Sequence, residues 1–147
     1  MMRLLVTFVL VTACAVSACG GDGGATPTAP TTVPSANVPF STVDVRVGTG
    51  AEATSGRTAA VNYALFHYSA TAADNKGGLL QTGPYSFLVG GNQAIAGFSQ
   101  ATLGMRVGGL RRAIVPPNLA YGNNPPANSG IAPNETLVFE IELLAVQ

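Results

Sequence analysis

The chain has 147 residues, with seven Lys or Arg and seven Asp or Glu, so its formal net charge is zero. Lys76 is the only lysine and Arg111–Arg112 the only adjacent basic pair. The sequence therefore lacks the basic surface with which proteins bind nucleic acid, and we expect no nucleic-acid partner. Once an N-terminal signal segment and a linker, described below, are set aside, roughly 100 to 110 residues remain, which is the usual size of one domain.

Residues 1–19 have the pattern of a bacterial lipoprotein signal peptide. A short basic start precedes an apolar run at 4–16, which is too short to span a bilayer. The motif VSAC, ending at Cys19, resembles a lipobox, in which the cysteine is lipidated and becomes the mature N-terminus. VTAC, ending at Cys14, is a competing match, and a plain secretory signal is the alternative to lipidation. We favour Cys19, because it allows a longer apolar run and opens onto GGDGG.

Residues 20–39 consist mainly of Gly, Thr, Pro, Ala and Ser, and such a segment cannot bury a core. We interpret it as a flexible linker between the lipidated cysteine and a domain at 40–147. The expected location is extracytoplasmic, in the periplasm or at the cell surface, with the lipid as membrane anchor. Because both cysteines precede the domain, the domain has no thiol for a metal or redox centre.

The first two strands are predicted from alternation of apolar and polar residues. At 41–48 the apolar positions share one face, which predicts a half-buried strand, and the same pattern recurs at 59–66. The apolar face of the first strand consists of Val43, Val45 and Val47, and that of the second of Val61, Tyr63 and Leu65.

Residues 67–78 form a polar stretch that predicts a loop ending in a Gly-Gly turn. The next strand is predicted at 79–89, with one face formed by Tyr85, Phe87 and Val89. Pro84 within it indicates an edge strand or a bulge, because proline donates no backbone hydrogen bond.

A single short helix is predicted at 92–105, with Asn92 as N-cap and Gly104 as stop. Its apolar face is formed by Ile95, Phe98, Thr102 and Met105. Two strands follow, at 107–115 and 136–144, and the second places Leu137, Phe139, Ile141 and Leu143 inward and Glu140 and Glu142 outward. These elements predict an α+β domain with a largely antiparallel sheet packed on one helix.

Few residues of the domain are suited to hydrolytic or metal chemistry. His67 is the only histidine, no serine lies in a GxSxG elbow, and we interpret His67 as a partly exposed residue at a strand end or in a loop. Glu140 and Glu142 are expected to face solvent. No phosphate loop, dinucleotide motif or metal-ligand cluster is present, so we expect neither metal nor cofactor. The long Pro/Gly/Asn-rich loop at 116–136, with Tyr121 near its base, is typical of a pocket wall.

The order and spacing of five motifs resemble the FKBP-type peptidyl-prolyl cis-trans isomerases, from about residue 43 to the C-terminus. The motifs are VNY at 61–63, PYSFLVGGNQAIAGF at 84–98, GMRVGG at 104–109, PPNLAYG at 116–122 and IAPNETLVFEIELL at 131–144. The resemblance implies the family fold, an antiparallel sheet of five or six strands wrapped on one short helix. It also implies a monomer that acts on proline-containing polypeptides.

The resemblance further implies a set of site residues. Tyr63 matches a pocket tyrosine, Tyr121 a loop tyrosine whose hydroxyl binds a ligand carbonyl, and Phe139 an aromatic on the last strand. With Gln81, these are the predicted catalytic residues. The predicted substrate-binding residues are Leu80, Tyr85, Ala94, Ile95, Phe98 and Ile131.

Three positions depart from the family pattern. Gln81 stands where an aspartate is usual, Phe98 where tryptophan is common, and Ala94 where a larger aliphatic residue is usual. We therefore expect a roomier and less polarising pocket.

The resulting hypothesis is an isomerase that binds the twisted X–Pro bond in an apolar aromatic pocket. The rival hypothesis is a tethered module or chaperone that binds proline-containing or apolar segments with weak or no turnover. A hydrolase that uses His67 is a third and more remote reading.

Overall fold

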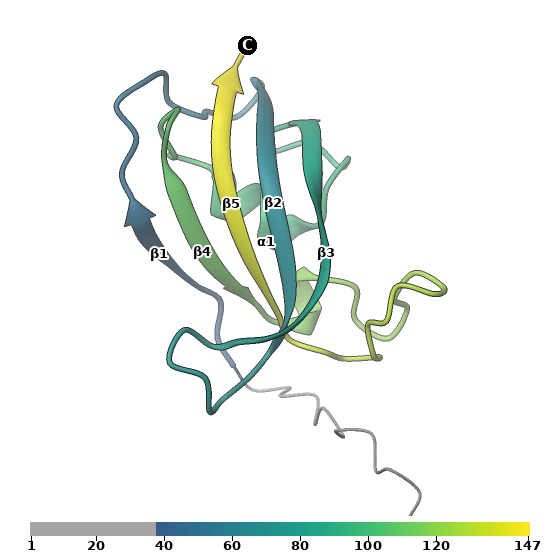
Figure 1. The fold of residues 1–147 in the computed structure, drawn as a ribbon. Coiled ribbons are helices and arrows are strands. Elements are labelled where there is room, and N and C mark those ends of the chain that lie inside the picture. Colours follow the sequence, from purple (N-terminus) through teal and green to yellow (C-terminus); the bar gives the residue numbers. More distant parts are fainter. Residues whose placement is uncertain (1–37) are drawn as a thin grey trace, which may run out of the picture. The chain divides into compact units, whose positions relative to one another are not determined.

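The computed structural model describes residues 38–147 (Figure 1). The predicted signal peptide, both cysteines and most of the linker lie outside these residues. The described part contains β1 (Ser41–Arg46), β2 (Thr58–Tyr68), β3 (Lys76–Leu88), α1 (Ala96–Thr102), β4 (Leu110–Val115), the 3-10 helix η1 (Pro117–Leu119) and β5 (Leu137–Val146). None of its helices is long and apolar enough to cross a membrane.

The five strands form one antiparallel sheet in the order β1-β4-β5-β2-β3. The sheet wraps around α1, which covers one of its faces (Figure 1). The predicted α+β architecture is therefore confirmed. Pro84 lies in β3, which is an edge strand, as its missing N–H requires.

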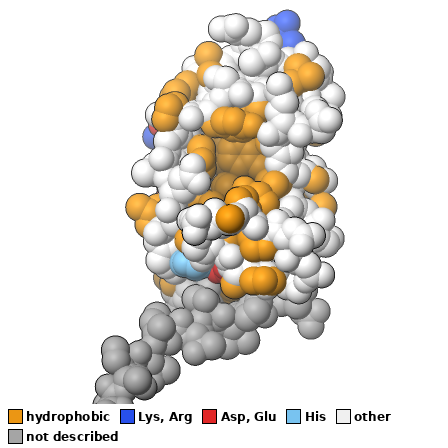
Figure 2. Space-filling view, turned by 90° about the vertical axis from the view of Figure 1, so that its right-hand side faces the viewer, with side chains coloured by type: hydrophobic (Ala, Val, Ile, Leu, Met, Phe, Trp, Pro, Cys, Tyr) orange, Lys and Arg blue, Asp and Glu red, His pale blue; other side chains and the backbone are white. Residues whose placement is uncertain are grey.

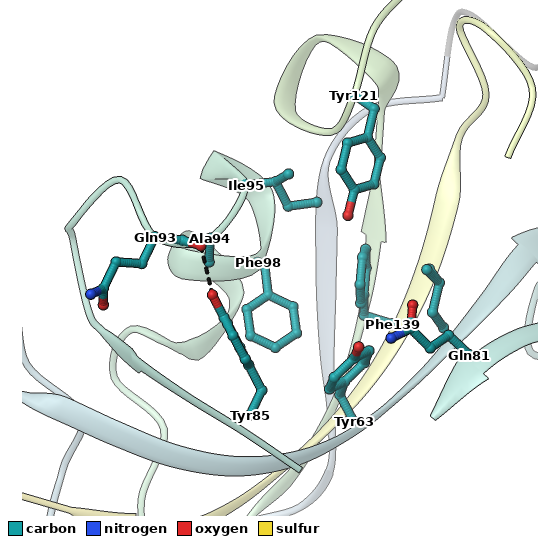
Figure 3. A pocket seen from close by; sticks show the side chains of 10 residues that line it. Tyr63, Gln81, Tyr85, Gln93, Ala94, Ile95, Phe98, Tyr121 and Phe139 are labelled. Carbon is teal, nitrogen blue, oxygen red and sulfur yellow. Dashed lines mark hydrogen bonds between the residues drawn. The ribbon is translucent and has the colours of Figure 1, made fainter. Parts of the chain in front are cut away.

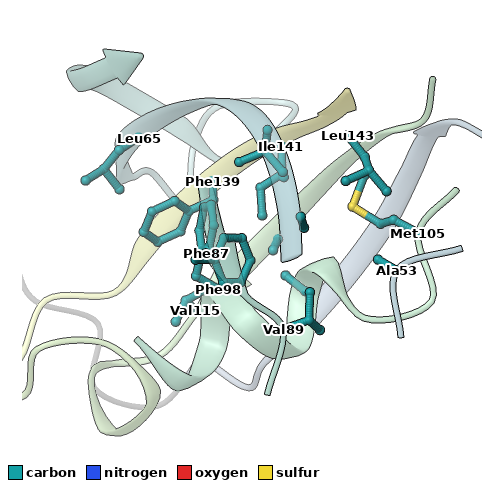
Figure 4. Close-up of a cluster of buried hydrophobic side chains, with 14 of the residues drawn as sticks. Ala53, Leu65, Phe87, Val89, Phe98, Met105, Val115, Phe139, Ile141 and Leu143 are labelled. Carbon is teal, nitrogen blue, oxygen red and sulfur yellow. The ribbon is translucent and has the colours of Figure 1, made fainter. Parts of the chain in front are cut away.

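The core lies between α1 and the sheet, and the alternation of β2, β3 and β5 builds it (Figure 4). Phe87, Ile141 and Leu143 are at most 1% exposed. Burying a side chain of this kind stabilises a protein by about 1.5–3 kcal/mol relative to leaving it in water. The predicted inward face of β5 is confirmed, since Leu137 and Phe139 are buried as well.

The prediction that β1 is half buried is wrong. All six of its residues are exposed, and Val43 keeps 61% of its surface. Val43 lies opposite Arg112, which lies opposite Glu140, so this valine is on the sheet face that points away from α1. The core-side position of the strand goes to Asp44, which binds Arg111 with two hydrogen bonds of 2.6 and 3.1 Å.

The predicted loop at 67–78 is shorter in the structure, because β2 runs to Tyr68 and β3 begins at Lys76. Gly77 and Gly78 lie within β3 rather than in a turn. A Cβ on Gly77 would lie 3.0 Å from the His67 carbonyl oxygen, which is a tight contact, so glycine favours the close approach of the two strands.

The helix begins later than predicted, at Ala96, and Ile95 rather than Asn92 is its N-cap residue. The helix cannot start at residue 92, because Gln93 is bonded to β3 through both its main chain and its side chain. The predicted stop is correct: Gly104 follows the last turn with a φ of +75°. The strand predicted from 107 starts at Leu110, after a turn in which Gly109 N donates to Arg106 O.

Four charged side chains form an ion-pair network on the outer face of the sheet. Lys76 Nζ lies 3.0 Å from both Asp74 and Glu140, and Arg112 lies 3.0 Å from Glu140. Glu142 pairs separately with Arg46, at 2.6 Å. The two glutamates thus face away from the core, as predicted, and each pairs with a cation.

Candidate functional site

A cavity of about 310 Å³ opens between β2, β3, α1 and the loop at 116–136. Figure 2 shows it as a hollow surrounded by hydrophobic side chains. None of its ten lining residues carries a charge. They are Tyr63, Leu65, Gln81, Tyr85, Gln93, Ala94, Ile95, Phe98, Tyr121 and Phe139.

Phe98 forms the floor of the pocket and is the centre of an aromatic cluster. Its ring centroid lies 5.3 Å from that of Phe139 and 5.7 Å from that of Tyr63, both in edge-to-face geometry. Phe87 contacts it from the core side at 5.2 Å. Edge-to-face pairs of this kind add about 0.5–1.5 kcal/mol each beyond the burial of surface. The floor is therefore apolar and rigid, although it lacks an indole N–H.

One wall of the pocket is held by Tyr85. Its hydroxyl donates to the carbonyl oxygen of Gln93 at 2.6 Å, and Gln93 Oε1 accepts from Leu88 N at 2.8 Å. These two bonds join β3 to the turn before α1. They therefore determine the position of Ala94 and Ile95, which line the cavity next to that turn (Figure 3).

The hydroxyls of Tyr63 and Tyr121 point into the cavity from opposite sides (Figure 3). No residue among 38–147 forms a hydrogen bond with either hydroxyl, so both are available to a ligand. Burial, together with the nearby Tyr85, raises the pKa of Tyr63. Burial, together with Tyr63 and Tyr85, raises the pKa of Tyr121. Both hydroxyls therefore stay protonated, and able to donate, to a higher pH than an ordinary tyrosine.

Tyr121 is carried by a loop that folds back on itself. η1 starts the loop, and Gly122, with a φ of +54°, turns the chain after Tyr121. Asn134 N donates to Gly122 O at 2.7 Å, which joins the returning arm of the loop to the outgoing arm. The long loop is thus ordered by its own hydrogen bonds, and its tyrosine forms one wall of the pocket.

The structure gathers most of the predicted site residues around this single cavity: Tyr63, Gln81, Tyr85, Ala94, Ile95, Phe98, Tyr121 and Phe139. Gln81 lies exposed at the rim. Leu80 and Ile131 do not line the cavity and instead pack, partly buried, against the core. Leu80 lies under the loop, 3.1 Å from where a Cβ on Gly130 would be.

Two lining residues were not predicted. Leu65 shares the inward face of β2 with Tyr63, so the alternation of that strand could have identified it. Gln93 carries no such signal, because its role depends on Tyr85 and on the backbone of Leu88. His67 is not a lining residue; it lies near the end of β2 with a side chain 22% exposed, where it contacts Glu135.

Residues 50–144 match the family model described as FKBP-type peptidyl-prolyl cis-trans isomerase. The chain belongs to this family. By family, the protein is therefore a peptidyl-prolyl cis-trans isomerase of the FKBP type.

Individual relatives agree with this assignment. The chain is 38% identical over 103 residues to an FK506-binding protein of Streptomyces anulatus. The aligned region covers 70% of this chain and 82% of that protein. It is 42% identical over 108 residues to the 39 kDa FK506-binding nuclear protein of Drosophila melanogaster, but spans only 28% of that longer protein.

Solved structures of FKBP-type proteins share the fold. A peptidyl-prolyl cis-trans isomerase of Pseudomonas syringae pv. tomato matches with a TM-score of 0.61 and 27% identity, over 74% of this chain and 75% of that one. FkpA of Escherichia coli matches with a TM-score of 0.59 and 31% identity, over 74% of this chain and 48% of that one. The sheet wrapped on a single helix is therefore the FKBP architecture.

Proposed function

We propose that this chain isomerises X–Pro bonds by binding the twisted bond in the uncharged aromatic pocket. Rotation about the bond faces a barrier of about 18–20 kcal/mol, because amide resonance favours the two planar isomers. A dry site that binds the twisted form better than either planar form lowers this barrier without a nucleophile or a base. The observation that carries the proposal is the aromatic floor beneath two tyrosine hydroxyls that no described residue engages.

Each part of the pocket has a proposed role. Phe98 and Phe139, which are 4% and 3% exposed, bind the proline ring and exclude water. The Tyr121 hydroxyl donates to a substrate carbonyl on the side of the loop. Gln81, at the rim, offers an amide that both donates and accepts hydrogen bonds. The substrate is therefore held by apolar contact and directional hydrogen bonds, and no charge is required.

The test follows cis-trans exchange of an X-Pro tetrapeptide by NMR, with the full chain as catalyst. We expect exchange to rise in proportion to the enzyme concentration and to fall by about tenfold or more in Phe139→Ala, which removes part of the floor. Leu144→Ala is the matched control, because Leu144 is exposed near the end of β5 and is not one of the lining residues. Unchanged exchange in a folded Phe139→Ala would contradict the proposed site.

A second candidate, a binding module for proline-containing or apolar segments, is favoured by the neutral Gln81 at the rim. It predicts that the same tetrapeptide shifts pocket resonances while its exchange rate stays at the uncatalysed value. The NMR experiment therefore distinguishes the two functions in one sample.

We further propose that the protein acts outside the cytoplasm, tethered by a lipid on Cys19. Support comes from the VSAC motif and the Gly/Thr/Pro-rich segment that follows it. Mass spectrometry of the N-terminal peptide after expression in a bacterium tests this. We expect a lipidated Cys19 that is lost in Cys19→Ser and kept in Cys14→Ser; lipid on Cys14 or on neither cysteine would contradict the proposal.

A further inference from the structure

The loop at 116–136 is tied to the sheet by one buried carboxylate. Glu135, only 5% exposed, lies just before β5. Its Oε2 accepts a hydrogen bond from Ala132 N at 2.7 Å, and its Oε1 contacts Nδ1 of His67 on β2. Because a carboxylate only accepts hydrogen bonds, the imidazole nitrogen is the donor. One side chain thus holds both the returning arm of the loop and the end of strand β2.

The neighbouring residue joins this anchor to the outgoing arm. Asn134 has a φ of +57°, a left-handed conformation that asparagine adopts more readily than most residues. In this conformation its N–H reaches Gly122 O at 2.7 Å, and its Nδ2 reaches Asn123 Oδ1 at 2.5 Å. Gly122 directly follows Tyr121. A continuous series of contacts therefore runs from His67 through Glu135 and Asn134 to the residue beside the pocket tyrosine.

We infer that Glu135 and His67 are positioning residues that hold Tyr121 at the pocket wall. We call Glu135, His67 and Asn134 the loop clamp. The inference rests on the proposed function, because it assigns a consequence to the position of the Tyr121 hydroxyl. Neither the carboxylate of Glu135 nor the imidazole of His67 lines the cavity, so the effect of these two residues on the substrate passes through Tyr121.

If the loop clamp positions Tyr121, two substitutions of Glu135 should lower kcat/KM to different extents. Glu135→Gln keeps an amide oxygen that accepts from Ala132 N, whereas Glu135→Ala loses both bonds. Hydrogen bonds to charged groups are among the stronger ones in proteins. In the full chain we expect kcat/KM to fall about tenfold in Glu135→Ala and by less in Glu135→Gln. Glu142→Gln is the matched control, since that half-exposed carboxylate binds Arg46 and lies opposite Asn62 in the middle of β2, away from the end that carries His67.

A double-mutant cycle separates positioning from general destabilisation. In the Tyr121→Phe background, adding Glu135→Ala should lower kcat/KM by less than about twofold, because the hydroxyl that the clamp positions is already gone. Equal losses in both backgrounds, in variants that are folded by circular dichroism, would overturn the inference. Where Glu135→Ala does not fold, Glu135→Gln and His67→Phe replace it in the same cycle.

A readout independent of activity distinguishes this inference from the proposed function. Amide hydrogen exchange should be faster at Asn134 and Gly122 in Glu135→Ala, while the amides of β5 that pair with β2 stay protected. If the wild-type chain shows no catalysis but this exchange pattern appears, the clamp stands and the proposed function fails. Wild-type exchange at Asn134 in a folded Glu135→Ala overturns the clamp whatever the activity.

Discussion

The Tyr85 hydroxyl donates to the Gln93 carbonyl oxygen at 2.6 Å, so a side chain of β3 holds the turn that leads into α1. Tyr85 also stacks on Phe87, with the ring centroids 5.6 Å apart and the planes at 10°. The residue therefore connects the core, the pocket and the helix start. It is part of the wall that determines how far Ala94 and Ile95 stand from the floor.

We expect Tyr85→Phe to lower the free energy of unfolding by about 1 kcal/mol, the usual net contribution of one hydrogen bond. The Gln93 carbonyl is then free, and the turn before α1 loosens, so kcat/KM falls as well. Urea unfolding and the NMR exchange assay measure the two effects. Tyr68→Phe is the control for the same chemical change, because no hydrogen bond of its hydroxyl occurs among the described residues. Equal effects in the two variants would contradict the role of the Tyr85–Gln93 bond.

The raised pKa values of Tyr63 and Tyr121 predict how stability changes at alkaline pH. The unfolded chain releases these protons near about pH 10, while the folded chain keeps them to higher pH. The unfolded state then binds fewer protons, so the free energy of unfolding falls as pH rises above about 10. Below about pH 9 both states are almost fully protonated, and these two groups leave stability unchanged.

Urea unfolding at several pH values checks this sign. Tyr121→Phe should reduce the alkaline loss of stability, because the variant has one fewer buried hydroxyl to ionise. A stability that rises between about pH 10 and 11 would show that the pocket favours tyrosinate, contrary to the burial of the two rings. The same series measures activity, which should fall as the Tyr121 hydroxyl ionises and ceases to donate.

Gln81→Asp tests whether a charge at the rim improves catalysis. In a planar amide the carbonyl oxygen carries partial negative charge, which is lost when the bond twists. A carboxylate nearby disfavours the planar form relative to the twisted one, so we expect kcat to rise several-fold with little change in KM. The exposure of Gln81 keeps the cost of the new charge small. Gln81→Asn is the neutral control, because it changes the side chain without adding a charge. Gln93, the other glutamine of the pocket, is not used for this test because its Oε1 already accepts a hydrogen bond from Leu88 N. An unchanged or lower kcat in Gln81→Asp would oppose this electrostatic account.

Arg111 should contribute more to stability than the exposed charged residues do. Its side chain is 15% exposed, binds Asp44, and donates to the carbonyl oxygens of Ala101 and Leu103, both at 3.0 Å. Arg111→Ala leaves those helix-end carbonyls without this donor, and we expect a loss of about 2–3 kcal/mol.

The control for Arg111→Ala is Arg46→Ala, whose side chain is 54% exposed in its pair with Glu142. An exposed pair contributes only about 0–1 kcal/mol. Thermal or urea unfolding compares the two variants. Similar losses in both would mean that the contacts of Arg111 with the end of α1 add little.

Sequence patterns predicted the elements whose side chains alternate between core and solvent. β2 and β5 followed the period of two residues, so Val61, Leu65 and Ile141 could be assigned to the core in advance. The same rule failed for β1, because an alternating pattern does not tell which face of an edge strand is covered. In β1 Val43 lies opposite the charged Arg112 on the outer face, and Asp44 takes the side that faces α1.

The aromatic residues of the pocket could be predicted from the sequence, but the contacts that hold the loop in place beside them could not. Motif order indicated Tyr63, Phe98 and Phe139, and the structure brings them within aromatic contact. The contact of His67 with Glu135 joins residues 68 positions apart in the chain. No local pattern encodes such a pair, since it depends on where the end of β2 meets the returning arm of the loop.

The absence of charge among the ten lining residues bears on the conditions under which the pocket works. Salt screens interactions between charges over a Debye length of about 8–10 Å at ordinary ionic strength, but it leaves shape complementarity and hydrogen bonds to neutral groups almost unchanged. Binding through Tyr121, Phe98 and Phe139 should therefore be almost indifferent to the ionic strength of the surroundings. Under the proposed function, we expect this pocket to select its ligands by fit and desolvation, with a selectivity that does not change with salt concentration.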